Sequence, residues 1–140
     1  MKIKIFTFLF SLIALATTAQ PGGGLNWMPD GNGYATLDKF SIVKTELPSL
    51  QKTVLFDFEK LIPNNEANPR KISSFSLSKD MKMVLLRINT TTLYHKTTGE
   101  VWVYNSTDEK IIQLGKSLRT DGLMYPKLSP DGTKAAFVYQ

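Results

Sequence analysis

The chain has 140 residues, of which 42% are hydrophobic and 11% aromatic, a composition typical of a folded protein with at most one modest domain. Lys and Arg outnumber Asp and Glu by 17 to 12, but the basic side chains are scattered among acids, so the charge predicts no nucleic-acid partner. The sequence has no cysteine, which excludes disulfides, thiolate nucleophiles and cysteine-ligated zinc.

The start of the chain has the pattern of a secretory signal peptide. Two lysines precede an apolar run from Ile5 to Leu15, and small residues up to Ala19 follow. This run is shorter than the about 20 residues that a membrane-spanning helix needs. We therefore expect residues 1–19 to be a cleaved signal peptide and residues 20–24 a linker. The mature protein would then be secreted or periplasmic, without membrane contact. A retained membrane anchor is the alternative.

After the linker the sequence predicts an all-β fold. Short runs rich in Val, Ile, Phe, Tyr and Thr alternate with turn clusters. The clearest predicted strands are residues 53–58, 81–88, 100–105, 110–114 and 134–139. In one of them Val101 and Val103 point to one face, while Trp102 and Tyr104 point to the other. Apolar residues on both faces predict sheets stacked on both sides, as between neighbouring propeller blades.

Three turn segments recur along the chain. Their aspartates, Asp30, Asp80 and Asp131, are 50 and 51 residues apart, which is about the length of one four-stranded blade. Pro, Asp and Gly each favour a tight turn, because Pro presets φ, Asp accepts hydrogen bonds from nearby backbone N–H groups and Gly adopts left-handed backbone. We therefore interpret these segments as hairpin turns rather than as sources of catalytic acids. The predicted structural turn residues are Asp30, Gly31, Asp80, Pro130, Asp131 and Gly132.

The repeat divides residues 25–140 into blades. Blade one spans residues 25–60, blade two spans 72–116, and blade three starts near Met124 and is still incomplete at Gln140. The predicted fold class is all-β, a partial β-propeller of about two and a half four-stranded antiparallel blades. Propellers need about four blades to close, and the last strand would expose an unpaired edge. We therefore expect the sequence to be a piece of a longer protein.

Three segments resemble the amino-terminal propeller of the dipeptidyl peptidase IV family. FSLSKDMKMVLLRIN resembles the family's S-I-S-P-D-G turn and strand, and LYHKTTGEVWVYN resembles R-H-S-x-x-A-x-Y-x-[IV]-Y-D. YPKLSPDGTKAAFVYQ is similar to W-S-P-x-G-x-K-[LI]-A-[FY]-V, and the order and spacing of the three segments agree over residues 25–140. Members of this family are serine exopeptidases that remove dipeptides from peptides with a penultimate proline or alanine.

The resemblance implies one candidate site residue. His95 falls on the motif histidine, which makes it the candidate substrate-binding residue, and we expect the Thr-rich segment before it to be a loop. The arginine that the family uses near the substrate falls on Tyr94, so no binding role is carried over to Tyr94. The family's paired glutamates and its hydrolase nucleophile, Asp and His would all lie beyond Gln140.

The sequence itself offers no catalytic, metal or cofactor site. G-x-S-x-G does not occur, since Ser117 stands in Gly-Lys-Ser-Leu-Arg. The single histidine can form neither a His-rich zinc site nor, without partner motifs, a credible triad. No segment has the spacing of a calcium loop. We therefore predict no catalytic residue, no metal and no cofactor within this chain.

The resemblance implies a propeller segment of an exported serine exopeptidase. In such enzymes the propeller admits unfolded peptides and positions their amino end, while a separate hydrolase domain carries out the chemistry. The implied partner is a peptide substrate, and a homodimer of the full-length enzyme is compatible with the resemblance. Two alternatives remain open: a non-enzymatic periplasmic propeller that binds protein partners, and a free-standing small β protein.

Overall fold

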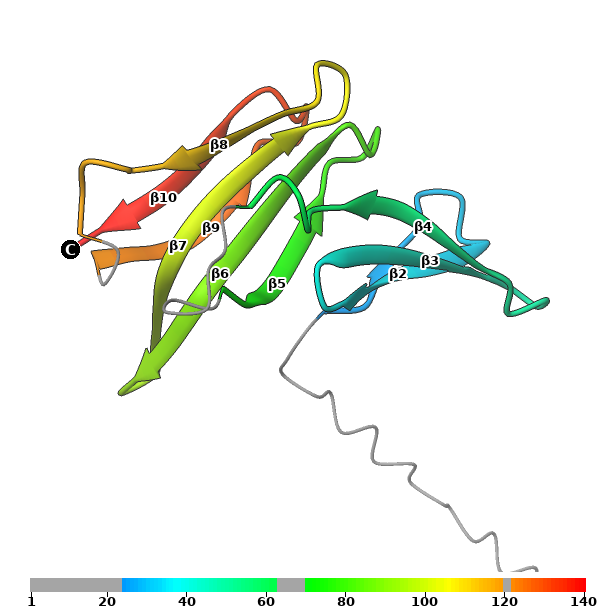
Figure 1. The fold of residues 1–140 in the computed structure, drawn as a ribbon, viewed down its shortest axis with the longest axis horizontal. Helices are drawn as coiled ribbons and strands as arrows, with labels where there is room; N and C mark the ends of the chain where they lie inside the picture. Colours follow the sequence, from blue (N-terminus) through cyan, green and yellow to red (C-terminus); the bar gives the residue numbers. More distant parts are fainter. Residues whose placement is uncertain (1–23, 63–69, 120–121) are drawn as a thin grey trace, which may run out of the picture.

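The computed structural model describes residues 24–62, 70–119 and 122–140, which form antiparallel β-sheets joined by turns (Figure 1). The predicted signal peptide and most of the predicted linker lie outside the described residues. Within the described ranges, no helix has the length and apolar character needed to cross a membrane.

The ten strands of the described residues form three sheets in chain order. The first sheet is a meander of β1 (Asn26–Trp27), β2 (Gly33–Asp38), β3 (Ser41–Glu46) and β4 (Lys52–Asp57). The second is a meander of β5 (Ile72–Leu77), β6 (Met83–Leu93), β7 (Lys96–Asn105) and β8 (Lys110–Leu114). The third consists of β9 (Leu123–Leu128) and β10 (Ala135–Tyr139). The prediction of a partial propeller with about two and a half antiparallel blades is confirmed.

The second sheet is covered on both faces, as Figure 1 shows. One face packs against the first sheet. The core between these two sheets includes Leu86 and Trp102 from the second sheet and Ile42 from the first. The other face packs Val101 and Val103 against strand β9 in a second core. Because neighbouring side chains on a strand point to opposite faces, both cores draw on the same strand, β7. The predicted alternation of Val101 and Val103 against Trp102 is thus confirmed.

The repeated turns are the β1–β2, β5–β6 and β9–β10 hairpin turns. Asp80 Oδ1 accepts hydrogen bonds from the Ser78 hydroxyl at 2.6 Å and from the Lys82 N–H at 3.2 Å. Asp131 repeats this arrangement with the Ser129 hydroxyl at 2.6 Å and a backbone N–H two residues later. The serine hydroxyl, and after it the backbone N–H, lowers the pKa of each of these carboxyl groups.

The first copy of the turn is simpler. Asp30 Oδ1 accepts a hydrogen bond from the Asn32 N–H at 3.0 Å. Gly31, Met81 and Gly132 occupy the same place in the three turns, with φ of 72°, 58° and 71°. Each copy therefore places a left-handed residue directly after the aspartate.

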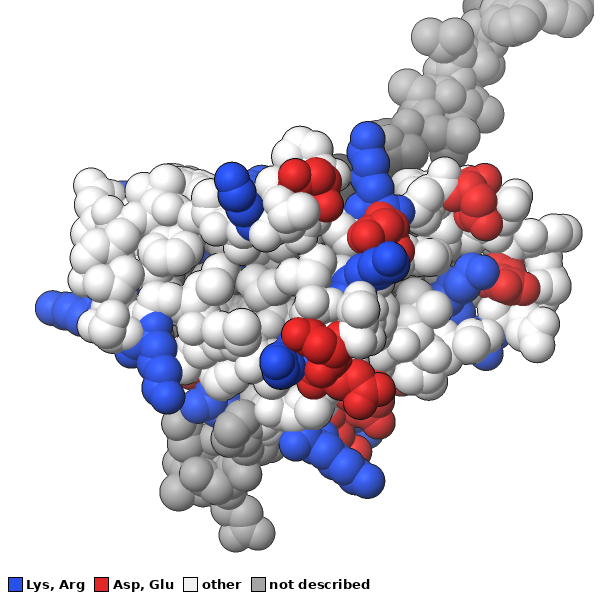
Figure 2. Space-filling model, turned by 90° about the horizontal axis from the view of Figure 1, so that it is seen from above, with Lys and Arg blue, Asp and Glu red and all other residues white. Residues whose placement is uncertain are grey.

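Charged side chains of both signs share the surface. Figure 2 shows acidic and basic side chains interspersed over one face of the molecule. One contact between opposite charges, Lys44 to Glu46 at 2.8 Å, lies along strand β3. It raises the pKa of Lys44, because the ammonium donates a hydrogen bond to the carboxylate.

Candidate functional site

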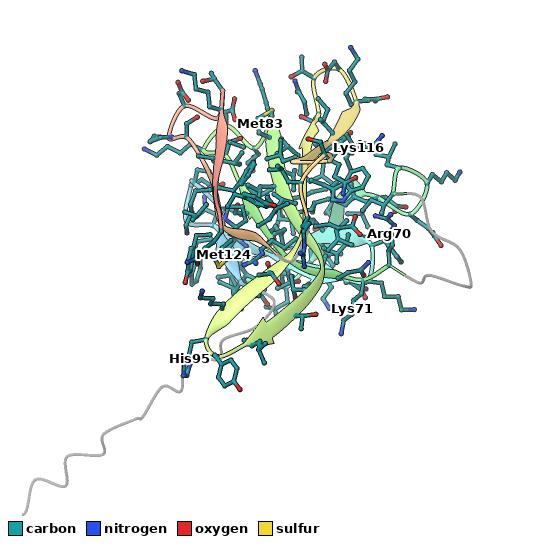
Figure 3. The ribbon with its side chains drawn as sticks, turned by 90° about the vertical axis from the view of Figure 1, so that its left-hand side faces the viewer. Arg70, Lys71, Met83, His95, Lys116 and Met124 are labelled. Carbon is teal, nitrogen blue, oxygen red and sulfur yellow. The ribbon has the colours of Figure 1, made fainter. Side chains whose placement is uncertain are left out.

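The β6–β7 hairpin is longer than the sheet that carries it. Strand β5 pairs with β6 only as far as Ile88, and β8 pairs with β7 only from Val101 onward. Beyond these points β6 and β7 pair only with each other, with Thr91 opposite Thr98 and Leu93 opposite Lys96. We call this two-stranded extension, residues 89–99, the ribbon. Figure 3 shows it projecting from the sheets with His95 at its tip.

A β-bulge separates the ribbon from the sheet. The register of β6 and β7 shifts between Ile88 and Thr91, and Asn89 within the shift has a φ of 51°. Gly99 on the partner strand has a φ of 155°, and a Cβ there would lie 2.8 Å from the Ile88 carbonyl oxygen. Only glycine fits this close approach of backbone to backbone. The bulge thus sets where the ribbon leaves the sheet.

Hydrogen bonds at the bulge mark the end of the pairing between β5 and β6. The Asn89 N–H donates to the Lys71 carbonyl oxygen at 2.9 Å, and Asn89 Oδ1 accepts a hydrogen bond from the Lys71 N–H at 3.0 Å. The Thr90 N–H donates to the Ser73 hydroxyl oxygen at 3.3 Å. These bonds pair backbone groups of Lys71, Asn89 and Thr90 at the point where β5 begins and the ribbon leaves the sheet.

The tip of the ribbon is a two-residue turn. Tyr94 and His95 have φ of 46° and 67°, the signs required by the tight turn that best matches the twist of a hairpin. Tyr94 is 87% exposed, and His95 is exposed beside it. A cavity of about 690 Å³ runs along one face of the ribbon, and Leu93, Tyr94 and Lys96 contribute to its lining. The cavity therefore offers an aromatic ring and an ammonium group to a ligand, and the exposed His95 imidazole is at the neighbouring position of the turn.

The sequence prediction for the segment before His95 was wrong. Residues 90–93 were expected to form a loop but belong to strand β6. Threonine is β-branched and has high strand propensity, and the Thr92 and Thr97 hydroxyl oxygens are 2.9 Å apart across the ribbon. The Thr-rich segment is therefore structural and supports the tip.

Two arginines brace the base of the ribbon. Arg87 Nη2 donates to the Thr97 carbonyl oxygen at 2.6 Å on the face toward β9. On the other face Arg70 pairs with Glu100, and its guanidinium carbon lies 5.5 Å from the centre of the Trp102 ring. Glu100 also accepts a hydrogen bond from Trp102 Nε1 at 3.0 Å. The two contacts join residues 10 and 30 positions apart and depend on strand register, which explains why sequence reasoning missed them.

The predicted turn residues lie away from the ribbon. The Asp80 turn connects β5 to β6, so it lies at the opposite end of β6 from His95, near the labelled Met83 in Figure 3. The carboxylates of Asp80 and Asp131 accept hydrogen bonds from serine hydroxyls within their own turns. Within the described part of the chain, no three His, Cys, Asp or Glu side chains gather as metal ligands.

Comparisons with known proteins find similarity in sequence and in overall fold. Residues 78–140 match the family described as the dipeptidyl peptidase IV amino-terminal region. The fold is similar to the crystal structure of Porphyromonas gingivalis dipeptidyl peptidase 4, with a TM-score of 0.67 and 25% identity over 82% of this chain. A second similar structure is the tricorn protease, with a TM-score of 0.46 and 15% identity over 83% of this chain and 11% of that one. No curated protein matches the sequence.

The chain corresponds to a small part of its structural relative. It spans 16% of the length of the Porphyromonas gingivalis enzyme. The family match begins at Ser78, in the β5–β6 turn, and includes the whole ribbon. The expected resemblance is therefore supported over residues 78–140, which match the amino-terminal region of the dipeptidyl peptidase IV family.

Proposed function

We propose that this chain is the propeller segment of an exported serine exopeptidase that removes amino-terminal dipeptides with a penultimate proline or alanine. The family match and the structural similarity to a bacterial dipeptidyl peptidase support a role in dipeptidyl peptidase activity. The signal-like sequence up to Ala19 supports export to a secreted or periplasmic location. The chemistry would come from a hydrolase domain, because this sequence contains no G-x-S-x-G motif.

The projecting ribbon is the observation that carries the proposal. It places the exposed Tyr94 and His95 beyond the edge of the propeller, next to the cavity along the ribbon. An extended peptide could lie against Leu93 and Tyr94, with His95 in hydrogen-bonding reach of its polar groups. Holding a substrate in this way raises its effective concentration at a nucleophile supplied from elsewhere. The propeller would thus act in substrate positioning.

The test is steady-state hydrolysis of a chromogenic Xaa-Pro substrate by the full-length protein and by Tyr94→Ala and His95→Ala variants. We expect each variant to lower kcat/KM by about tenfold, mainly through KM, because a lost positioning contact weakens binding. The matched control is Lys52→Ala, an exposed side chain on β4, which should leave kcat/KM unchanged.

Two outcomes would contradict the proposal at different points. Full activity in both ribbon variants would show that the tip does not contact the substrate, while the peptidase assignment would stand. Absence of Xaa-Pro hydrolysis by the full-length protein would overturn the peptidase assignment and favour a propeller that binds protein partners.

A further inference from the structure

A second cavity lies between the second and third sheets. It has a volume of about 460 Å³ and runs between β5 and its turn on one side and β9 on the other. Three cationic side chains contribute to its lining, Lys79, Arg87 and Lys127, and none of the described residues that line it is acidic. Like charges that share a concave site raise the local concentration of anions.

Of the three cations that line this cavity, Arg87 stands within the β5–β6 ladder. Its guanidinium is half-buried, and desolvation lowers its pKa. One N–H group donates to the Thr97 carbonyl oxygen, but Nε is buried and has no hydrogen-bond partner among the described residues. Buried polar groups are almost always paired, and a bound ion or water is the usual reason when the protein supplies no partner. The buried Nε itself is not reached from the cavity, but Arg87 lines the cavity and is only half-buried, so other N–H groups of its guanidinium can donate to a ligand there.

Two serine hydroxyls lie on the same side of the sheet as Arg87. Ser74 stands directly opposite Arg87 in the β5–β6 ladder, and Ser76 stands opposite Leu85. Both serines line the cavity. Directly opposed residues on a sheet have Cβ atoms about 5 Å apart, so the Ser74 hydroxyl and the Arg87 guanidinium can reach one ligand. A guanidinium beside a hydroxyl suits an oxygen-bearing anion, since both groups donate hydrogen bonds to it.

We propose that the cavity between β5 and β9 binds an oxyanion, a carboxylate or a phosphate, through Arg87 and Ser74, with Lys79 and Lys127 adding charge. This site goes beyond the proposed peptidase function and does not depend on it. The Arg87 guanidinium also holds the Thr97 carbonyl oxygen at the base of the ribbon. An anion at this position therefore fixes the side chain that braces the ribbon.

The test is isothermal titration calorimetry of the full-length protein with three probes in a low-chloride buffer. The probes are inorganic phosphate, an acetylated tripeptide with a free carboxyl terminus, and the same tripeptide as its amide. We expect saturable one-to-one binding of an anionic probe and no binding of the amide. Binding of the peptide acid alone identifies a peptide carboxylate as the ligand, and binding of phosphate alone identifies an inorganic anion. Binding of both supports a general oxyanion site.

Variants then assign the binding to the cavity. Arg87→Met should weaken binding by about tenfold or more, because charge-assisted hydrogen bonds are lost. Lys52→Met removes the same charge far from the cavity and should change the affinity less than about twofold. If Arg87→Met does not fold, Ser74→Ala and Lys127→Met serve instead, each with an expected loss of about threefold. The proposal is overturned if neither anion binds, or if Lys52→Met weakens binding as much as the cavity variants do.

Discussion

Gly132 in the β9–β10 turn lies directly against Ser78 in the β5–β6 turn, so that a Cβ at position 132 would come within 3.0 Å of the Ser78 Cβ. The repeated turns of neighbouring blades thus touch, and glycine has two reasons to occupy this position. Its φ of 71° is left-handed, and the space beside it is filled.

Replacement of Gly132 by alanine should destabilise the fold through both effects. The left-handed backbone costs an alanine about 1 kcal/mol, and the contact with Ser78 adds about 1 kcal/mol more. Urea unfolding followed by tryptophan fluorescence measures the loss. Gly31→Ala is the matched control, because Gly31 has a φ of 72° and open space within 4 Å. Equal losses in the two variants would show that the contact between turns contributes nothing.

Glu100→Gln should destabilise the protein by about 2–3 kcal/mol. The carboxylate is only 14% exposed, pairs with Arg70 and accepts a hydrogen bond from Trp102 Nε1, so its loss removes a counter-charge from a largely buried guanidinium. The same change at Glu46, which is 45% exposed and paired with Lys44, should cost less than about 1 kcal/mol. Chemical unfolding of both variants checks the difference, and equal effects would contradict it.

Gly99→Ala should disrupt the bulge that carries the ribbon. Besides its contact with the Ile88 carbonyl oxygen, a Cβ there would lie 3.0 Å from the Thr90 Cα, and backbone atoms cannot move aside easily. We expect a loss of about 2 kcal/mol or more, together with faster proteolysis of residues 89–99. Lys52→Ala, an exposed change on β4, should stay within about 0.5 kcal/mol of the original protein. A ribbon as resistant to protease as before would contradict this account.

Stability should fall in acid because of the repeated turns. The pKa values of Asp80 and Asp131 are lowered from the ordinary value of 3.8, so the unfolded chain binds protons at higher pH than the folded one. The stabilisation is therefore fully present above about pH 4 and is lost as the pH falls through the lowered folded-state pKa values. The double variant Ser78→Ala, Ser129→Ala removes the hydroxyl hydrogen bonds that are the largest cause of both lowered pKa values. It should therefore make stability depend less steeply on pH in acid.

Unfolding midpoints measured from pH 2 to pH 7 check the acid prediction. Lys52→Met lies outside both turns and should keep the slope of the original protein. A double serine variant with an unchanged slope would show that the hydroxyl bonds do not control the acid response.

Local pattern was enough to predict much of the propeller. The recurrence of Asp30, Asp80 and Asp131 marked the three hairpin turns, because turn chemistry depends on a few adjacent residues. The alternation around Trp102 predicted a sheet buried on both faces, because side-chain direction follows from strand geometry alone. The Thr-rich segment was misjudged because it lacks apolar alternation, although its partner strand pairs with it residue by residue.

By itself the sequence determined the class of fold, the positions of the turns and the likeness to a peptidase family, since each depends on short segments and their spacing. Only the tertiary structure decided that β6 and β7 extend as a ribbon with His95 at its tip, and that Arg70 meets Glu100 across the sheet. It also decided that Arg87 lines a cavity and that its buried Nε has no hydrogen-bond partner among the described residues. These relationships depend on register and on the stacking of sheets, which bring together residues that no local pattern connects.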